Sequence, residues 1–480
     1  MGAARALMLA SALVAGCAGP AGGGRPDDAG LAPQADALLS EALAVQPFSG
    51  ALVMMRDGRV VHAQGWGLAD RGSGVPFTPE TPSDGGSLAK TFTAASVWWL
   101  VHEGRLALAS PVRHLVPEYP HDCVTVAHLL AHSAGLAPDY AGFDRHFHPG
   151  QARSTAALLQ LAGRDAPEPA FAPGTGFAYS DLGYDALALA VERASGQPYA
   201  DFVRERFFRP HGLVHSFVRP VRLADWPVPR TRGYRWRDGR WEDHDAYDDE
   251  AFVGGSNLVF SAGDLARWGQ AWALGGALPA AAETPARQRP RIAGRVSALD
   301  GLHWWCDDGG TRCHFIGALN GFHALVFWDR ARRESVGLVT NTELPPWTLF
   351  TLERGLVDRL AGREPPATER WAALLATRHD AADVAAAVRS TGCFRLPDGR
   401  QVTLIRDGAA LQLQIDDQPP EGLEHVAGRV YRRPADESWV AMEAGSTGLG
   451  RLHLRSLYDD LTATAAAPCA TGTPTGRPPA

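Results

Sequence analysis

The segment from Gly85 to Val101 constrains this chain most, because it has the pattern of a helix that is apolar on nearly every face. A helix of this kind must be surrounded by the rest of the protein. Ser87 and Lys90 lie three residues apart near its start, so they share one face of the first turn. The segment therefore predicts a buried helix whose N-terminal end carries two polar side chains.

Lys90 is the single lysine among the 46 basic side chains of the chain, and all the others are arginine. A serine hydroxyl becomes an effective nucleophile when a neighbouring base takes its proton. A buried lysine can be that base because desolvation lowers its pKa, whereas arginine stays protonated. The one exception to the arginine preference falls where this chemistry requires an amine. The pattern favours Ser87 as nucleophile and Lys90 as base over a helix cap beside a solvated lysine.

The same residues permit a second interpretation, a degenerate nucleophile elbow of an α/β-hydrolase at Gly85–Ala89. That motif requires a strand immediately before the serine. The preceding segment 78–84 contains two prolines and is not expected to be a strand. The elbow is therefore the weaker interpretation.

Strand and helix signals alternate along the first three quarters of the chain. Two apolar runs, Ala51–Arg56 and Arg59–Gln64, flank Asp57-Gly58, which is typical of a hairpin. A second strand pair is expected at His323–Trp328 and Ser335–Thr340. Helices are expected over Leu88–Glu103 and Asp185–Ser195, each followed by glycine. The mixture predicts an α+β fold whose antiparallel sheet takes strands from both ends of the chain.

The pattern changes after about residue 365. Residues 366–390 are Ala-rich and charged, which favours a helical linker. Residues 391–464 contain short strands separated by turns such as Asp398-Gly399 and Asp407-Gly408, which predicts a small, mostly antiparallel β module. Residues 465–480 are rich in Thr, Pro and Gly and are expected to be disordered.

The N-terminus has the pattern of an export signal. Residues 1–16 contain Arg5 and a short apolar stretch, and they end before Cys17 in a sequence that resembles the lipobox of bacterial lipoproteins. The resemblance implies that Cys17 is acylated, and Ala18 after it implies outer-membrane sorting in a Gram-negative cell. The alternative is an ordinary signal peptide with a chance cysteine. Residues 17–35 are expected to form a flexible tether.

The composition excludes several classes of partner. A net charge of −7 without basic blocks argues against nucleic-acid binding. No apolar run of membrane-spanning length follows the N-terminus, so contact with a membrane is expected only through a lipid anchor. The remaining expectation is a small-molecule or peptide substrate and a monomeric protein.

The cysteines and histidines predict disulfides and no metal site. Cys306 and Cys313 flank a turn-like segment and are expected to form a bridge, and Cys393 and Cys469 a second one. Cys123 is then expected to be a buried free thiol. The sequence has no CxxC or HExxH pattern, so neither a metal nor another cofactor is expected. His128 and His132, four residues apart, are expected to cap and pack rather than ligate.

The chain resembles the serine β-lactamase and penicillin-binding-protein superfamily, in its class-C-like branch, over roughly residues 45–360. The resemblance rests on the Ser87-x-x-Lys90 segment and on four further motifs. These are Gly65–Asp70, Val124–Leu136, Phe177–Tyr184 and Phe315–Ala318 with Asn320-Gly321-Phe322. It implies a DD-peptidase-like fold over residues 36–365, with an antiparallel sheet, flanking helices and a helical subdomain. It also implies that the C-terminal module is barrel-like.

The resemblance implies a role for each matching residue. Ser87 would be the acylated nucleophile, Lys90 its base and Tyr179 the phenol that moves protons to the leaving group and from water. The backbone N–H groups of Ser87 and Ala318 would form the oxyanion hole. Tyr179 could instead be a buried aromatic residue with a satisfied hydroxyl.

Two positions depart from the family pattern, and both concern substrate binding. Asp181 stands where the family has Asn, and a carboxylate there favours a charged Lys90 and so weakens it as a base. Phe315, Ile316 and Gly317 stand where the family has a cation, a hydroxyl and glycine. An apolar residue leaves a substrate carboxylate unpaired, unless Arg312 or His314 replaces the cation.

Three functions follow. An esterase-like serine hydrolase acting on neutral esters or amides through an acyl-enzyme is favoured. The alternatives are a D-Ala-D-Ala carboxypeptidase, D-amino-acid peptidase or β-lactamase with the same chemistry, and a non-catalytic binding protein on the same fold.

Overall fold

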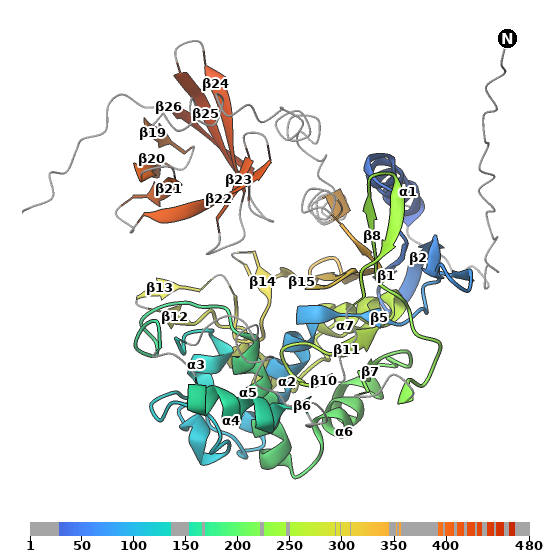
Figure 1. Ribbon diagram of the computed structural model, residues 1–480, viewed down its shortest axis with the longest axis vertical. Coiled ribbons are helices and arrows are strands. Elements are labelled where there is room, and N and C mark those ends of the chain that lie inside the picture. The colour runs from blue at the N-terminus through green and yellow to red at the C-terminus, as the bar shows by residue number, and fades with distance from the viewer. Residues whose placement is uncertain are drawn as a thin grey trace, which may run out of the picture.

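A computed structural model describes residues 28–135, 153–165, 169–220, 225–245 and 250–344, the last without 293, 298 and 308. It also describes a few positions within 352–356 and residues 392–465 with short gaps. Its centre is an antiparallel six-stranded sheet with the order β14-β15-β16-β17-β1-β2 (Figure 1). These strands are β1 Gly50–Arg56, β2 Arg59–Trp66, β14 Trp305–Cys306, β15 Arg312–Leu319, β16 Phe322–Asp329 and β17 Glu334–Thr340.

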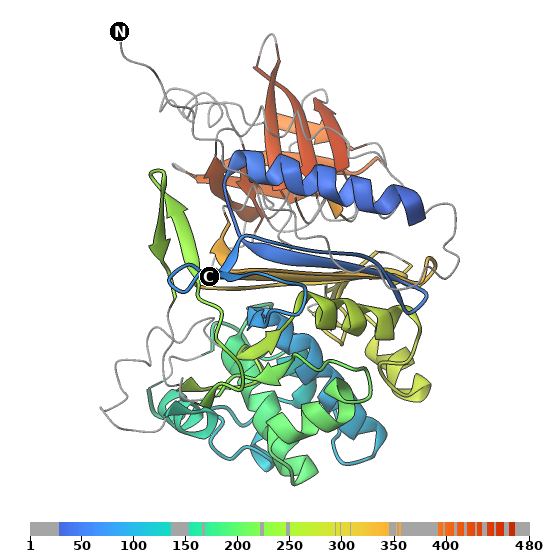
Figure 2. The ribbon, with the colours of Figure 1, turned by 90° about the vertical axis from the view of Figure 1, so that its right-hand side faces the viewer.

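Helices cover both faces of this sheet. The long N-terminal helix α1 lies on one face, and the remaining helices lie on the other (Figure 2). The helices are α1 Asp28–Val45, α2 Ala89–His102, α3 Val126–Leu130, α4 Thr155–Asp165, α5 Asp181–Ser195, α6 Tyr199–Val203, α7 Ala262–Ala273 and α8 Ala280–Ala286. Burial on both faces explains why β1, β16 and β17 are almost continuously apolar rather than alternating.

The sheet joins the two ends of the domain, as the sequence predicts. Strand β1 pairs with β17 from Gly50 opposite Thr340 to Arg56 opposite Glu334. The hairpin of β1 and β2 turns at Asp57 and Gly58, whose φ angles of 50° and 76° are both left-handed. That conformation fits a two-residue turn matched to the strand twist. The expected hairpin and the expected strand pair at β16 and β17 are both confirmed.

Short elements complete the domain. They are the strands β3 Leu68–Asp70, β4 Val75–Pro76, β5 Ser83–Asp84, β6 Arg153–Ser154, β7 Phe217–Val218, β8 Tyr234–Arg237, β9 Arg240–Asp243, β10 Glu250–Ala251, β11 Leu258–Phe260, β12 Arg291–Ile292, β13 Arg295–Val296 and β18 Thr342–Glu343, with 3₁₀ turns at Gly86–Leu88 and Val112–His114 and a π turn at Arg204–Phe208. Strand β5 ends three residues before Ser87, where no strand was expected. Its partner β11 is antiparallel to it, so the segment is not the parallel strand of an α/β-hydrolase elbow.

The C-terminal module is a closed barrel. Its strands are β19 Gly392–Arg395, β20 Gln401–Asp407, β21 Ala410–Ile415, β22 Glu421–Ala427, β23 Val430–Arg432, β24 Trp439–Gly445, β25 Gly448–Arg455 and β26 Asp460–Ala465. All neighbouring pairs are antiparallel, and β26 closes on β19. Alternate residues fill the interior, such as Val440 and Met442 on β24, because successive strand side chains point to opposite faces. The expected antiparallel, barrel-like module is confirmed.

Two expected boundaries along the chain differ from those in the structure. The flexible tether was expected to extend to residue 35, but α1 begins at Asp28, and its residues Ala35 and Leu38 pack on the sheet. Ala465 ends β26 and so is not part of a disordered tail. The signal segment 1–16, Cys17, the linker 366–390 and residues 466–480 lie outside the described residues. No helix in the described part of the chain is long and apolar enough to cross a membrane.

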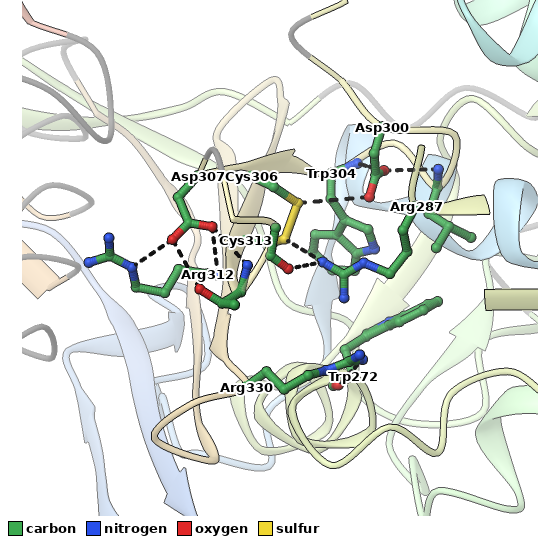
Figure 3. Close-up of a disulfide and its surroundings, with 12 residues drawn as sticks. Trp272, Arg287, Asp300, Trp304, Cys306, Asp307, Arg312, Cys313 and Arg330 are labelled. Carbon is green, nitrogen blue, oxygen red and sulfur yellow. Dashed lines mark hydrogen bonds and ion pairs between the residues drawn. A yellow bond between two sulfur atoms is a disulfide. The ribbon is translucent and has the colours of Figure 1, made fainter. Parts of the chain in front are cut away.

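The cysteines follow the prediction in part. Cys306 and Cys313 form the expected disulfide, with an S–S distance of 2.01 Å, between paired positions of β14 and β15 (Figure 3). Cys393 is also disulfide-bonded, and its expected partner Cys469 lies outside the described residues. The expectation that Cys123 is buried is wrong. Cys123 is free and exposed, because it lies in a turn before α3 rather than in an element that packs on the core.

Removing the disulfide between β14 and β15 should destabilise the domain. A Cys306→Ser/Cys313→Ser variant loses a constraint on the unfolded chain, and for a loop this short the free energy of unfolding should fall by about 2 kcal/mol. Urea unfolding under non-reducing conditions measures the change. Cys123→Ser, which removes the exposed free thiol, is the matched control and should leave the unfolding midpoint in place. An unchanged midpoint in the double variant contradicts the prediction.

Candidate active site

Ser87 lies in a tight turn between strand β5 and helix α2. The 3₁₀ turn Gly86–Leu88 leads directly into α2, and Ser87 is partly exposed among buried neighbours. Gly86 has a φ of 51°, a left-handed conformation that glycine adopts without strain. The helix behind the turn is buried along most of its length, as predicted, with Phe92 stacked on Trp268 at 4.2 Å. Ser87 is therefore held at the surface by a rigid support.

Strand β15 lies directly against this turn. A Cβ atom added at Gly317 would stand 1.8 Å from the carbonyl oxygen of Gly85, so only glycine fits there. A Cβ atom added at Gly86 would stand 2.8 Å from the amide nitrogen of Ala318. The backbone of Ala318 is therefore adjacent to the residue before Ser87. Gly317 serves this site by permitting close approach of two backbone segments.

Lys90 is fully buried about one helical turn after Ser87, and three acceptors surround its ammonium group. Its Nζ donates to Ser87 Oγ at 3.2 Å and to the carbonyl oxygen of Gly255 at 2.6 Å. It also donates to Asp181 Oδ1 in a short ion pair. The Tyr179 ring centroid is 4.8 Å from the same nitrogen. The structure thus brings Ser87, Lys90, Tyr179 and Asp181 together.

The sequence leaves the charge state of Lys90 open, because burial is expected to lower its pKa and the Asp181 carboxylate to raise it. Burial does act in its expected direction, but the Asp181 carboxylate and contacts to Tyr179 outweigh it and hold the pKa of Lys90 above its ordinary value. The pKa of the Tyr179 phenol is raised, chiefly by burial. Both groups therefore hold their protons at neutral pH. Lys90 is an ammonium in the resting site.

Helix α5 places Tyr179 and Asp181 on either side of its N-cap. Ser180 is the cap, and its side chain accepts the backbone N–H of Gly183 at 3.1 Å. The helix begins at Asp181, four residues earlier than expected. The nearby side chains of Ser87 and Lys90 act to lower the pKa of the Tyr179 phenol, against the larger effect of burial. One capped turn thus sets the positions of the phenol and the carboxylate together.

A pair of buried histidines supports this turn from behind. His132 Nδ1 accepts the backbone N–H of Ser180 at 3.0 Å, so the proton of the neutral ring is on Nε2, which faces His303 Nε2 at 2.8 Å. The His132 ring also stacks on Tyr179, with a centroid distance of 4.4 Å. Burial and the nearby Lys90 charge lower the pKa of His132. The pair therefore packs as neutral rings.

His128 and His132 do not share a helix face as their spacing suggested. Helix α3 ends at Leu130, and His132 has a left-handed φ of 53°. His128 caps the helix in a reciprocal arrangement with Thr125, as expected of a capping residue. The described residues contain no cluster of three or more potential metal ligands.

The third motif is apolar in the structure as in the sequence. Phe315 is 1% exposed and packs on the α2 side of the sheet, with its ring 4.4 Å from that of His303. It forms part of the packed floor rather than a surface that a ligand could touch. Ile316 packs on the opposite, α1 side.

The two basic residues upstream do not supply a replacement cation. Arg312 and His314 share the parity of Ile316, so they face away from Ser87. Arg312 donates to Asp307 at 3.1 Å, and His314 is fully buried against Trp305. The alternative that one of them replaces the family cation is therefore wrong.

Three further residues at the site were missed by the sequence analysis. Gly255 contributes only a backbone carbonyl. Asp185 and His303 support residues that surround Lys90. Asp185 Oδ1 accepts the N–H of Gly255 at 2.8 Å. The double glycine at 254–255 is the only local signal, and it packs against α5, where a side chain would collide with Tyr184 or Asp181.

The family model described as Beta-lactamase matches residues 35–359, about two thirds of the chain. The chain belongs to the beta-lactamase family. Its members are serine hydrolases, and the fold, the contact of Ser87 with the buried Lys90 and the family assignment agree that this protein is an enzyme of that class.

Relatives within the family differ in their named activities. Esterase EstB from Burkholderia gladioli is 31% identical over 361 residues, which cover 71% of this chain and 83% of EstB. Penicillin-binding protein 4* from Bacillus subtilis is 30% identical over 178 residues, which cover 37% of this chain and 39% of that protein. The solved octameric penicillin-binding protein homologue from Pyrococcus abyssi has a TM-score of 0.60 at 19% identity. That likeness covers 90% of this chain and 99% of the other, and it concerns the fold.

Gly317→Ala should separate strand β15 from the Ser87 turn. The added methyl group cannot occupy the 1.8 Å gap to Gly85, so the Ala318 backbone must move away. We expect the hydrolase activity to fall by about 10²-fold, the cost of losing one oxyanion donor, with a lowered melting temperature. Gly276→Ala, where the added atom would meet nothing closer than 3.9 Å, is the control. Wild-type activity in Gly317→Ala would show that this contact does not shape the site.

Proposed function

We propose that this beta-lactamase family member hydrolyses neutral esters or amides through an acyl-enzyme on Ser87, with esterase-like activity. The observation that carries the proposal is the contact of Ser87 with the ammonium of Lys90 at the start of a buried helix. The partly exposed hydroxyl is within reach of substrate, and the amine behind it is sealed from water. A serine hydroxyl within hydrogen-bond reach of an amine that can relay its proton is the geometry that serine activation uses.

Each remaining group has a proposed part in the reaction. Ser87 Oγ attacks the acyl carbon, and the N–H groups of Ser87 and Ala318 stabilise the negative oxygen that forms. Tyr179 contacts both Ser87 and Lys90, so its phenol is placed to protonate the leaving group and then to orient the water that releases the acyl group. His132 positions Tyr179 by stacking on it.

Substrate preference follows from the third motif. The family position for a cation is held by the buried Phe315, and Arg312 and His314 face the other side of the sheet. A substrate carboxylate placed there would lose its hydration without gaining a partner, which is costly. Neutral acyl compounds avoid this cost. The similarity to a protein named as an esterase supports the same preference.

Turnover of p-nitrophenyl butyrate should exceed turnover of nitrocefin and of a D-Ala-D-Ala peptide, measured as kcat/KM. Ser87→Ala and Lys90→Arg should each lower ester turnover by more than about 10³-fold, because general-base activation alone contributes 10²–10⁴-fold. Arg59→Lys exchanges the same two side-chain types at an exposed position and should leave the rate unchanged.

Faster turnover of nitrocefin or of the peptide would favour the β-lactamase or peptidase alternative over the esterase. Failure of the wild-type protein to turn over any of the three substrates or to react with a fluorophosphonate would favour a non-catalytic binding protein.

We also propose export and lipid attachment through Cys17, supported by the lipobox-like sequence before it. Metabolic labelling with a fatty-acid analogue should mark the wild-type chain and not a Cys17→Ser variant. Equal labelling of both chains, or of neither, would contradict the proposal.

A further inference from the structure

We propose that Asp181 takes up the proton that Ser87 loses during acylation, and that Lys90 relays this proton between them. The inference rests on the proposed serine hydrolase function and adds the route that the proton takes. In this route Lys90 passes a proton on and is an ammonium both before and after acylation, so the reaction needs no resting neutral amine. Asp181 is one of the two departures from the family pattern, and the proposal gives that departure a role.

Three acceptors surround Lys90 Nζ. An ammonium has three N–H donors and no lone pair. Here the acceptors are Ser87 Oγ at 3.2 Å, the Gly255 carbonyl oxygen at 2.6 Å and Asp181 Oδ1. With one acceptor for each N–H, the nitrogen can take the Ser87 proton only if it gives one of its own protons away.

The possible receivers of that proton differ in chemistry. The Gly255 carbonyl oxygen is a backbone amide oxygen, which accepts hydrogen bonds but is too weakly basic to take a proton. Its position is fixed because the N–H of the same residue donates to Asp185. Tyr179 holds its own proton, since burial raises the pKa of the phenol. Asp181 is a carboxylate in direct contact with Nζ and can accept the proton.

The other groups that face Lys90 are neutral rings. Burial raises the pKa of Tyr184 on α5, as it does that of Tyr179. Burial, together with the Lys90 charge, lowers the pKa of His132 and His303. Among the described residues packed around Lys90, Asp181 thus supplies the compensating negative charge.

The step balances in protons and charge. As Ser87 Oγ bonds to the acyl carbon, the carbonyl electron pair moves onto oxygen. One Nζ proton moves to Asp181 Oδ1, rotation about the Cε–Nζ bond turns the freed lone pair toward Ser87 Oγ, and the Ser87 proton moves to Nζ. Asp181 becomes a neutral acid, and its negative charge is replaced by that of the oxyanion. When the tetrahedral intermediate collapses and the leaving-group bond breaks, the proton returns from Asp181 through Lys90 to the leaving group, directly or by way of Tyr179.

Asp181→Asn separates this relay from a mechanism in which a neutral Lys90 is the base. The substitution removes the Asp181 charge, the largest effect that raises the pKa of Lys90, so the pKa should fall. If a neutral amine is required, the variant should acylate faster than the wild type at pH 7. If Asp181 receives the proton, the variant should acylate more slowly. The two mechanisms therefore predict opposite signs for one substitution.

The experiment measures the acylation rate of Ser87 by the burst of p-nitrophenol and by fluorophosphonate labelling, from pH 6 to pH 9. We expect Asp181→Asn to lower the rate at pH 7 by about 10²-fold or more, the scale of general-base catalysis. We also expect the wild-type rate to change less than tenfold between pH 7 and pH 9. Asp122→Asn, the same change at an exposed carboxylate, is the control.

An Asp181→Asn rate equal to or above the wild type overturns the proposal. So does a wild-type rate that rises about tenfold per pH unit over this range, as a neutral amine with a raised pKa requires. The wild-type profile decides the question if the variant does not fold, as judged by its melting curve. If wild-type Ser87 is not labelled at all, the proposed function fails and not the proton route alone.

Discussion

The structure of the site depends on one ammonium group enclosed by protein. A buried charge is costly unless it is paired and fully hydrogen-bonded, and Lys90 meets this requirement with a carboxylate, a hydroxyl and a backbone carbonyl from three separate parts of the chain. Each of these partners is held by its own support. Helix α2 carries Ser87, the Ser180 cap carries Asp181, and the glycine pair packed on α5 carries the carbonyl. Removing the Asp181 support leaves an unpaired charge inside the domain, and removing either of the others leaves a buried N–H without an acceptor. The stability of the fold is therefore linked to the geometry of its chemistry.

Strand β15 of the central sheet shapes the site in two ways: it brings a backbone segment to Ser87, and it carries no cation at the third motif. Gly317 lets β15 approach the Ser87 turn, which brings the Ala318 backbone to the reacting hydroxyl. Two residues before it, the strand carries Phe315 into the core beside His303, where the family pattern has a cation. The same strand therefore retains the backbone part of the site and omits the side chain that suits carboxylate substrates. This combination is the physical basis for proposing neutral esters or amides as substrates.

Signals that depend on neighbours in sequence predicted the structure well, and those that depend on distant contacts did not. The Asp57-Gly58 hairpin and the buried helix around Lys90 follow from local conformation and apolar pattern, and both are present. The helix expected from Asp185 begins at Asp181 instead, because Ser180 caps it through a hydrogen bond to Gly183. The effect of Asp181 on the charge of Lys90 was predictable from the motif, but its balance against burial was not. The third partner of Lys90 was not predictable either, because the carbonyl of Gly255 is 165 residues away and has no side chain to reveal its role. Cys123 shows the same limit, since a residue in a turn has no pattern that fixes its burial.

The account rests on covalent chemistry at one hydroxyl, so peptide mapping of the acyl-enzyme during ester turnover tests it most directly. Rapid acid quenching preserves the ester bond, and mass spectrometry of the digested protein locates the added acyl group. The account predicts the adduct on the peptide that contains Ser87, formed and lost at the rate of turnover. Ester turnover with no adduct on Ser87, or with the acyl group on another residue, would contradict it.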